Sequence, residues 1–364
     1  MQGKKIVIAH NWSETSFNTQ SVKLAETLSE NNEVVFISQS RLSASSPLII
    51  NQNLTIYQWP NKRPRSIKDF IFCYRLLKKF KPDFVISHFG SYNIMTIACF
   101  LLNIKYRIGW YHTVKEAIDL DFKGSRISFY LSRFRKKLIY QLGGYTVIVS
   151  NYTKKEVVEY YHRKESHVHR IYNGLADTNI RNNNNGELVF GFLGRYDACK
   201  GIDVLLQAIA IVKKENANIK FNIAGGKLTV QQKEMIEQLG IADVINEIGH
   251  IKYDKVLSYL ASHFAMIVPS KVDNLNTVVL ESFTTATPVI GSNAGGIPEM
   301  IQHRENGLLF PTQNYEALAQ QIIALTKDPS KRNEMSAKAR STYEANFTIP
   351  VHLKNVTTFL ETLT

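Results

Sequence analysis

The chain has 364 residues, of which 44% are hydrophobic and 21% are charged, and its formal net charge is +13. This composition excludes a disordered or fibrous protein, and the length favours two globular domains. The three cysteines, Cys73, Cys99 and Cys199, are far apart and form no CxxC pair. We therefore expect neither a disulfide framework nor a zinc site, and a reducing, cytoplasmic compartment.

The sequence predicts no segment that is exported or crosses a membrane. The first ten residues, MQGKKIVIAH, lack the apolar run and the cleavage site of a signal peptide. The longest apolar stretch, residues 94–102, is too short to span a bilayer. We expect a soluble protein, which does not preclude binding to a membrane surface.

The positive charge is concentrated in the first half. Residues 1–176 carry 26 Lys and Arg against 12 Asp and Glu, whereas residues 177–364 carry 18 against 19. Two segments hold much of the surplus, residues 62–81 and residues 123–137. They are either solvated helix faces or a surface for an anionic partner such as lipid, a phosphorylated acceptor or nucleic acid.

The first half alternates short apolar runs with amphipathic stretches. The apolar runs are β-branched and bounded by polar residues, as buried strands are, and the stretches between them have helical spacing. This alternation predicts a parallel, doubly wound α/β sheet. The predicted strands are KKIVIAH (4–10), EVVFIS (33–38), DFVISHF (83–89), YRIGWYH (106–112) and YTVIVS (145–150), and the predicted helices cover residues 21–30, 70–80 and 128–142.

The alternation restarts after RNNNNGE (181–187), which has no core-forming residue and is typical of a linker or surface loop. We expect one domain over residues 1–176, a second over 177–349, and a C-terminal helix over 350–364 that could pack back on the first domain. A helix is predicted from Asp203. The second set of strands is LVFGFLG (188–194), IKFNIAGG (219–226), NEIGHI (246–251), FAMIVPS (264–270) and TPVIGS (287–292).

The first strand of the second half runs directly into GFLGRYDACKG. Gly191 and Gly194 allow a tight turn, after which Arg195 and Lys200 follow at the carboxyl end of the strand, where ligands of such sheets bind. Two cations in one loop suit a diphosphate, although two surface cations beside a turn would look the same. The later AGGKLT is not a phosphate-binding Walker loop, because it lacks the required first glycine and the Ser or Thr after the lysine.

A second candidate site lies in PSKVDNLNTVVLESF (269–283). Asn276 or Thr277 is a plausible cap for a helix over TVVLESFTTA, whose N-terminus would favour phosphate. Glu281 falls in a stretch that should be buried, and a buried carboxylate needs a partner. Paired ribose hydroxyls would be suitable partners for Glu281, and Asp273 could accept hydrogen bonds from the hydroxyls of a second sugar. An internal salt bridge to Glu281 is the alternative.

These residues resemble the Glu-x7-Glu motif of the retaining family 4 glycosyltransferases, in a variant whose first acid is Asp273. Further motifs of that family occur in the right order over residues 82–310: PDFVISH, VIVSNYTKKEVVEYY, VHRIYNGLADT, FLGRYDACKGID, IVPSKVDNLNTVVLESFTTATPVIGSNAGGIPEMI and ENGLLF. The resemblance implies two Rossmann-like domains of GT-B type that face a central cleft, with a nucleotide sugar bound mainly by the second.

The resemblance also implies a role for individual residues. Arg195 and Lys200, after Gly194, would bind the donor diphosphate, and Glu281 would hold the ribose hydroxyls. Asp273 would contact the transferred sugar, and His112, at the end of a first-domain strand, would contact it near the reacting carbon. The remaining donor contacts would come from Asn274, Leu275, Asn276 and Thr277 beside sugar and phosphate, and from the backbone of Ile251 beside the base.

The chain departs from the family pattern in its first loop, which reads HNWSETSFNTQS where a Gly-Gly pair is usual. Asn18 and Thr19 are candidates to supply the missing amide or hydroxyl contacts. Gly295 and Gly296, in NAGGIPE, fit either a close backbone approach or a tight turn, with Glu299 ordering that loop.

The implied reaction moves a hexosyl or N-acetylhexosaminyl group from a nucleoside-diphosphate sugar, such as a UDP-sugar, to a carbohydrate or lipid-linked acceptor with retained configuration. No convincing Asp-x-Asp metal clamp is present, so no cofactor and no metal is expected. The setting would be bacterial cell-surface polysaccharide, lipopolysaccharide or glycolipid synthesis. The enzyme would be cytoplasmic, or peripheral at the inner face of the membrane through the basic first half.

Two other functions fit parts of the sequence. A nucleotide-sugar epimerase uses similar domains without an acceptor, and the basic first half argues mildly against it. A nucleic-acid-binding protein would explain the charge, but Phe70, Phe72 and Tyr74 have the helical spacing of core residues. We therefore expect no nucleic-acid partner.

Overall fold

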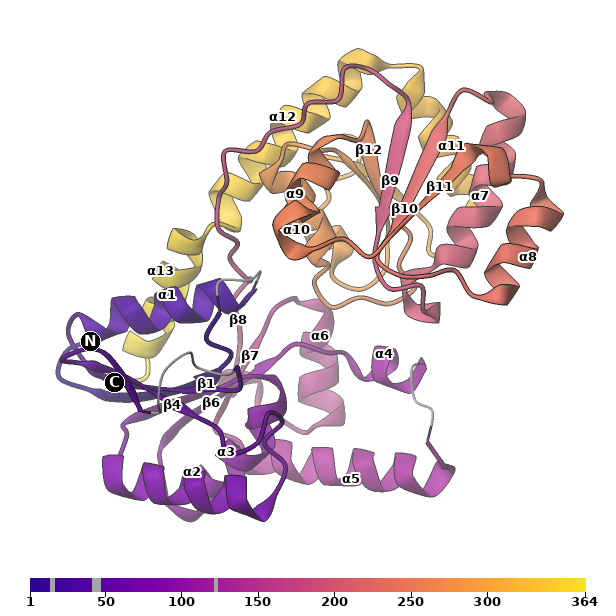
Figure 1. Cartoon of the computed structure of the whole chain (residues 1–364). Coiled ribbons are helices and arrows are strands. Elements are labelled where there is room, and N and C mark those ends of the chain that lie inside the picture. The colour runs from indigo at the N-terminus through magenta and orange to yellow at the C-terminus, as the bar shows by residue number, and fades with distance from the viewer. Residues whose placement is uncertain (14–16, 41–46, 121–123) are drawn as a thin grey trace. The chain divides into compact units, whose positions relative to one another are not determined.

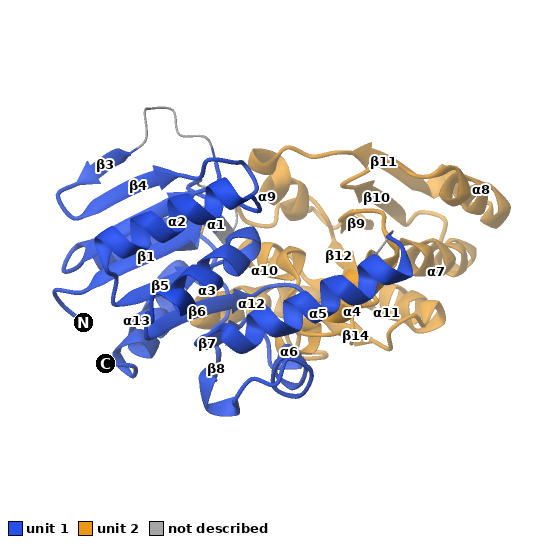
Figure 2. Cartoon of the chain, turned by 90° about the horizontal axis from the view of Figure 1, so that it is seen from below, with its two compact units in different colours: residues 1–114, 123–176, 348–364 blue, residues 115–122, 177–347 orange. Residues whose placement is uncertain are grey.

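A computed structural model of the chain describes residues 1–13, 17–40, 47–120 and 124–364 (Figure 1). The chain forms two compact units, shown separately coloured in Figure 2. Unit 1 contains residues 1–114, 123–176 and 348–364, and unit 2 contains residues 115–122 and 177–347. Two segments differ from the division expected from sequence: residues 115–122 group with unit 2, and the return to unit 1 begins at residue 348 rather than 350.

Unit 1 is built on a sheet that has eight strands within the described residues, in the order β3-β4-β2-β1-β5-β6-β7-β8. All neighbouring strands pair in parallel except β3 and β4, which are antiparallel. The strands are β1 (Lys5–His10), β2 (Glu33–Ser38), β3 (Leu48–Asn51), β4 (Leu54–Gln58), β5 (Phe84–Ser87), β6 (Tyr106–Tyr111), β7 (Tyr145–Ile148) and β8 (Val168–Arg170).

Helices cover both faces of this sheet, so its central strands are buried on both sides and read as continuous apolar runs. The helices α1 (Phe17–Ser29) and α13 (Ile349–Glu361) pack together on one face. The helices α2 (Ile67–Phe80), α3 (Tyr92–Leu101) and α5 (Arg126–Leu142) cover the other face, with α3 in contact with both neighbours (Figures 1 and 2). The short helix α6 (Tyr152–Lys155) follows β7.

Unit 2 is built on a parallel sheet that has six strands within the described residues, in the order β11-β10-β9-β12-β13-β14. Its strands are β9 (Val189–Leu193), β10 (Lys220–Ala224), β11 (Ile245–Gly249), β12 (Ala265–Val268), β13 (Val289–Ser292) and β14 (Leu308–Phe310). Its helices are α4 (Lys115–Leu120), α7 (Ile202–Glu215), α8 (Val230–Leu239), α9 (Tyr253–Ala261), α10 (Thr277–Thr284), α11 (Tyr315–Thr326) and α12 (Pro329–Asn346).

The predicted fold class is confirmed, because both units are doubly wound α/β sheets and every predicted strand is present to within a few residues at its ends. Four strands, β3, β4, β8 and β14, were not predicted from the sequence. β8 and β14 have three residues each, and β3 is a largely exposed edge strand, so none of these three forms the buried apolar run by which a strand is recognised.

The segment RNNNNGE is held against unit 2 rather than being a free linker. The Asn182 side chain donates to the carbonyl of His263 at 2.9 Å and to Oγ1 of Thr287 at 3.0 Å, and its Oδ1 accepts from Arg332 at 2.7 Å. The low complexity of the segment concealed this anchoring role.

Both sheets reverse their strand order at one point, between β1 and β5 in unit 1 and between β9 and β12 in unit 2. Ligands of doubly wound sheets bind beyond the carboxyl ends of the strands at such a reversal. The predicted site residues after β6, β9, β11 and β12 all lie at these sheet edges.

Candidate active site

The carboxyl end of β9 is a tight turn at Gly194. The Gly194 amide donates to the carbonyl of Ala224, at the end of β10, at 3.0 Å. A Cβ at Gly225 would lie 2.3 Å from the carbonyl oxygen of Gly194, and Gly225 has a φ of +113°, so only glycine fits there. The turn is followed by Arg195, whose side chain is 69% exposed and pairs with Asp197 at 3.0 Å.

A second glycine brings Lys200 to the end of β12. Lys200 closes a short 3-10 turn, and the next residue, Gly201, has a φ of +67°. A Cβ there would lie 2.0 Å from the carbonyl oxygen of Pro269, so the absence of a side chain lets this turn pack on the loop after β12. The amide of Lys271 also donates to the carbonyl of Cys199 at 2.8 Å and fastens the two loops together.

These loops join two of the predicted site residues in an ion pair. Lys200 Nζ donates to Oδ2 of Asp273 at 2.7 Å, with the two side chains 25% and 13% exposed. Asn276 Nδ2 donates to the same oxygen at 2.7 Å, and Ser270 Oγ lies at 3.4 Å. Within the described residues these contacts all fall on Oδ2, so Oδ1 can accept a hydrogen bond from a ligand.

The cap of α10 is Asn276, which decides between the two predicted candidates. Its Oδ1 accepts from the amide of Val279 at 3.2 Å, and Thr277 is the first residue of the helix. One side chain thus caps the helix and holds Asp273 in front of its N-terminus. The preceding Asn274 and Leu275 are buried, at 5% and 6% exposure.

The loop after β13 supports the backbone of Asp273. Gly295 has a φ of +57°, and a Cβ there would lie 1.7 Å from the carbonyl oxygen of Asp273. The amide of Gly296 donates to that same oxygen at 3.2 Å. The two glycines therefore serve both as a tight turn and as a close backbone approach, the two alternatives that the sequence left open.

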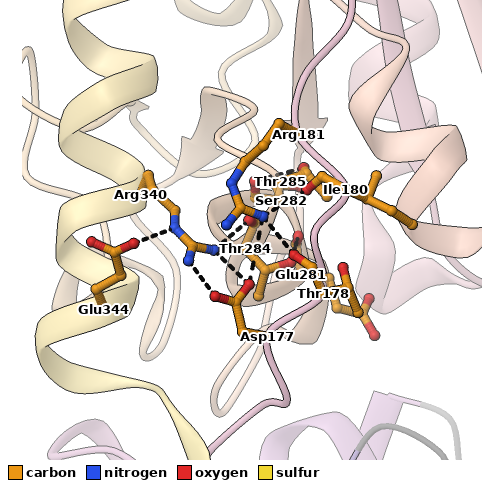
Figure 3. A network of polar contacts seen from close by, with 10 residues as sticks. All are labelled: Asp177, Thr178, Ile180, Arg181, Glu281, Ser282, Thr284, Thr285, Arg340 and Glu344. Atoms are coloured by element: carbon orange, nitrogen blue, oxygen red, sulfur yellow. Dashed lines mark hydrogen bonds and ion pairs between the residues drawn. The ribbon is translucent and has the colours of Figure 1, made fainter.

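Glu281 lies one turn into α10 and is 9% exposed, so the prediction that this acid is buried is confirmed. Its carbonyl accepts from Oγ1 of Thr284 at 2.7 Å. Figure 3 shows it beside a network in which Arg340, from α12, donates to Asp177 and to the carbonyl of Thr284 at 2.8 Å each. Arg340 thereby holds the carboxyl end of α10, and a cation is favourable at that end of a helix.

Ile251 follows β11 by two residues and is half-buried. It lies, with the residues after β9 and β12, along the carboxyl edge of the unit 2 sheet. The structure therefore places the predicted residues of the second half that follow β9, β11 and β12 along one sheet edge, with Glu281 one turn into α10, and it joins Asp273 to both Lys200 and Asn276.

In unit 1, His112 directly follows β6 and meets a second histidine. Its Nε2 lies 3.0 Å from Nδ1 of His88, which directly follows β5. His88 in turn lies against His10, the last residue of β1, with ring centroids 4.4 Å apart, and Phe89 stacks on His112 at 4.0 Å. Three neighbouring strands of the sheet thus each have a histidine as their last residue or directly after it.

Burial keeps this histidine cluster neutral. Desolvation lowers the pKa of His10 and of His112 to about 3, and nearby histidines add to the effect at His112. The pKa of His88 is also lowered well below its usual value, first by desolvation. With neutral rings, one nitrogen of the His88–His112 contact must donate and the other accept, so the tautomer of one residue sets that of the other.

The first-loop candidates Asn18 and Thr19 lie in the first turn of α1 and are half-buried. Asn18 Nδ2 donates to Oγ of Ser13 at 2.8 Å. The loop residues 14–16 between them lie outside the described part of the chain. Nothing in unit 1 assigns a ligand contact to Asn18 or Thr19, so their role stays a prediction.

Sequence reasoning missed His10, His88 and Gln20. Gln20 is fully buried and ties α1 to the segment before unit 2, since its side chain donates to Asn173 at 3.1 Å and accepts from the amide of Gly174 at 2.7 Å. The two histidines could have been found from their position in the sequence. His10 is the last residue of a buried parallel strand, and His88 directly follows another.

Two family models match consecutive parts of the chain. Residues 18–178 match the model described as "Glycosyltransferase Family 4", and residues 175–342 match "Glycosyl transferases group 1". Together they account for both α/β units. Among curated proteins, an uncharacterized glycosyltransferase of Haemophilus influenzae is 25% identical over 339 residues, which cover 88% of this chain and 89% of that protein.

Other relatives match over a shorter range. An uncharacterized glycosyltransferase of Methanocaldococcus jannaschii is 27% identical over 198 residues, and the match spans only 50% of that protein and 50% of this chain.

The solved structure of Anabaena HepE in complex with UDP superposes with a TM-score of 0.76, covers 98% of this chain and 100% of its own, and is 14% identical. The chain belongs to the family 4 glycosyltransferases and has their GT-B fold.

Proposed function

We propose that this glycosyltransferase moves a sugar from a UDP-sugar to an acceptor hydroxyl with retained anomeric configuration. The observation that carries the proposal is the contact of Lys200, Asp273 and Asn276 in front of the N-terminus of α10, at the point where the sheet reverses its strand order. A cation, a carboxylate and a helix N-terminus together match a phosphorylated sugar. The UDP bound to the structurally similar HepE supports the choice of nucleotide.

The diphosphate is assigned to Lys200, Arg195 and the amides at the start of α10. An ammonium group has three N–H donors, and Asp273 takes one of those of Lys200, so two can reach phosphate oxygens. The negative charge that develops on the leaving phosphate is then stabilised by groups already in position. This supply of charge by the protein is why we propose a reaction without a metal cofactor.

The two acids are assigned to hydroxyl groups. Asp273 Oδ1 is available for the transferred sugar because Lys200 and Asn276 bind Oδ2. Glu281 would accept from the ribose hydroxyls, and Ile251 would lie beside the base. A charged acceptor strengthens such hydrogen bonds relative to a neutral one.

Retention is proposed to proceed on one face of the sugar, with the departing phosphate taking the proton of the acceptor hydroxyl. The bond from the anomeric carbon to the phosphate oxygen breaks while the bond to the acceptor oxygen forms. A neutral His112, held by His88, is suited to position the transferred sugar through a hydrogen bond rather than to act as a base.

The transferred group is proposed to be a hexosyl or N-acetylhexosaminyl group, and the acceptor a carbohydrate or lipid-linked sugar of bacterial surface polysaccharide, lipopolysaccharide or glycolipid. The enzyme would then work in the cytoplasm or at the inner face of the membrane. These assignments rest on the family and on the basic first half of the chain, where residues 1–176 contain 26 Lys and Arg but only 12 Asp and Glu.

A thermal-shift panel tests the proposal. We expect UDP and one or a few UDP-sugars to raise the Tm, whereas other nucleoside diphosphates raise it less. The UDP-sugar that gives the largest shift should then release UDP with a suitable acceptor, and the product should keep the anomeric configuration on NMR. Formation of an epimeric UDP-sugar without any acceptor would instead establish an epimerase, and no shift with any nucleotide would refute the donor assignment.

A further inference from the structure

Helix α5 exposes a continuous apolar stripe. Five large side chains lie on it at successive helical turns, with exposures between 45% and 74%: Ile127, Tyr130, Leu131, Phe134 and Leu138. Their spacing places them on one side of the helix. Single exposed apolar residues are ordinary, but a contiguous apolar patch marks a surface that binds a protein, a membrane or a ligand.

The stripe is not the face by which α5 packs on its own unit. Ile139 and Tyr140 are buried at 5% exposure each, and Tyr140 lies among Tyr92, Tyr111 and Tyr161. The buried face of α5 therefore docks on its own unit, and the five residues of the stripe do not take part in that packing.

Cations border the stripe, and no acid is present in α5. Arg126 and Arg135 are exposed, and Arg133 and Lys137 are half-buried, whereas Lys136 points inward and lies 5.1 Å from the ring centroid of Tyr111. By helical spacing Arg126, Arg133 and Lys137 fall along one side of the stripe and Arg135 along the other. An apolar strip with a cation border and no acid has the chemistry of a helix that lies in a lipid headgroup layer.

A second helix of the same layer has the same character. In α2, Ile67 and Ile71 are 70% and 42% exposed, and its exposed cations include Lys68, Arg75, Lys78 and Lys79. The one acid of α2, Asp69, is fully buried as part of the cap. Helices α2 and α5 both pack beside α3 on one face of the sheet (Figure 2), so the cations of α2 and α5 lie on the same side of unit 1.

We propose that the α5 stripe is a docking surface for a membrane that contains anionic phospholipids. The stripe residues would enter the boundary between headgroups and acyl chains, and the bordering arginines would contact lipid phosphates. Charge complementarity favours this partner over a second copy of the chain, because two α5 helices would bring five cations each together without an acid. Among the described residues no helix is long and apolar enough to span a bilayer, so the contact is at the surface.

Sedimentation of the full chain with vesicles tests this docking. The vesicles are phosphatidylcholine alone and an equimolar mixture of phosphatidylcholine and phosphatidylglycerol, without any nucleotide sugar. We expect the protein to pellet with the anionic vesicles only. The stripe variant L131S/F134S and the charge variant R126E/R135E should each lower the partition coefficient at least about tenfold, because each removes two side chains that contact lipid.

The matched control is V230S/K233E, which changes one exposed apolar residue and one exposed cation of α8 in unit 2. It should pellet like the native chain. All substitutions are at exposed or partly exposed positions, and an unchanged thermal transition confirms folding. The docking is measured without donor, so its failure would leave the proposed transfer reaction untouched.

Three results would overturn the docking surface. They are equal pelleting with neutral vesicles, native pelleting of both α5 variants, and loss of pelleting in the control. Self-association that light scattering detects in the native chain but not in L131S/F134S, with no lipid binding, would show instead that a second copy covers the stripe.

Discussion

At the scale of single residues, the proposed site depends on the ion pair between Lys200 and Asp273. Lys200 and Asp273 are 73 positions apart and meet at 2.7 Å because Gly201 and Gly295 let their loops pack without a side chain. The sequence indicated both residues, and indicated Glu281 from its place in an apolar helix. It did not indicate that Lys200 and Asp273 would pair, because their contact depends on loop conformations that cannot be predicted from the spacing of residues.

Lys200→Ala should lower turnover by about 10²-fold or more, the usual effect of removing one preorganised donor to a developing charge. Steady-state kinetics with a saturating UDP-sugar measure it. The matched control is Lys271→Ala, which removes a neighbouring ammonium group that is paired with Asp203 at 2.7 Å and keeps the backbone amide that joins the two loops. Equal losses in the two variants would mean that Lys200 acts only through the packing of the loop.

We expect His88 to position His112. His88→Phe keeps a ring against Trp110, on which His88 stacks with centroids 4.7 Å apart, but removes the 3.0 Å contact to His112. Because His112 can then rotate and change tautomer, we expect kcat to fall by about tenfold, on the scale of one neutral hydrogen bond. KM for the donor should change little. A raised KM with an unchanged kcat would assign His88 to binding instead.

At the scale of elements, α10 is held at both ends. Asn276 caps its start, and Arg340 binds the carbonyl of Thr284 near its end. The sequence predicted α10 well because its cap and apolar residues are local signals. The sequence did not show which face of α5 is buried, because both faces of that helix carry apolar residues and only tertiary packing determines which of them is covered.

Arg340→Ala should destabilise unit 2 by about 1–3 kcal/mol, because it removes bonds to Asp177, Thr284 and Glu344 from a side chain that is 13% exposed. Differential scanning calorimetry measures the fall in Tm. In the same helix, Lys331→Ala breaks only an exposed pair with Glu334, at 41% and 63% exposure, and should cost about 0.5 kcal/mol or less. A similar Tm for both variants would contradict an anchoring role for Arg340.

At the scale of the whole molecule, two α/β units could be predicted from the sequence because parallel strands, buried on both faces, leave continuous apolar runs. The grouping of residues 115–122 with unit 2 could not be predicted, since a short amphipathic segment fits either unit, whereas the return of the C-terminal helix to the first domain was among the expectations. The clustering of buried histidines was equally hidden, because it arises only when β1, β5 and β6 lie side by side.

Buried histidines of unit 1 make stability depend on pH. One is His10 of the cluster, which is 1% exposed, and another is His352 of α13, which is 3% exposed and whose Nδ1 lies 2.8 Å from the carbonyl oxygen of Tyr172. Desolvation lowers the pKa of His10 to about 3 and that of His352 to about 4. The unfolded chain, with ordinary histidines near 6.5, therefore binds more protons than the folded chain below that pH, and stability falls as the pH falls toward these values. At pH 5 each residue should account for a loss of about 2 kcal/mol.

Calorimetric scans at pH 7.5 and pH 5 should show a lower Tm at pH 5. The decrease should be smaller in His10→Phe, which removes one of the titrating groups. Among the described residues, neither ring nitrogen of His10 has a hydrogen-bond partner, so phenylalanine breaks no bond. An identical decrease in the variant and the native chain would refute this origin of the pH dependence.

The central claim is that the edge of the unit 2 sheet binds the nucleotide of a sugar donor, with Glu281 on the ribose. Isothermal titration calorimetry of UDP into the native chain, Glu281→Gln and the exposed control Glu305→Gln tests it most directly. We predict binding at one site in the native chain and in the control. In Glu281→Gln we predict affinity about ten- to a hundredfold weaker, since charge-assisted hydrogen bonds to the hydroxyls are lost. Native affinity in Glu281→Gln, or no binding of UDP by the native chain, would contradict the account.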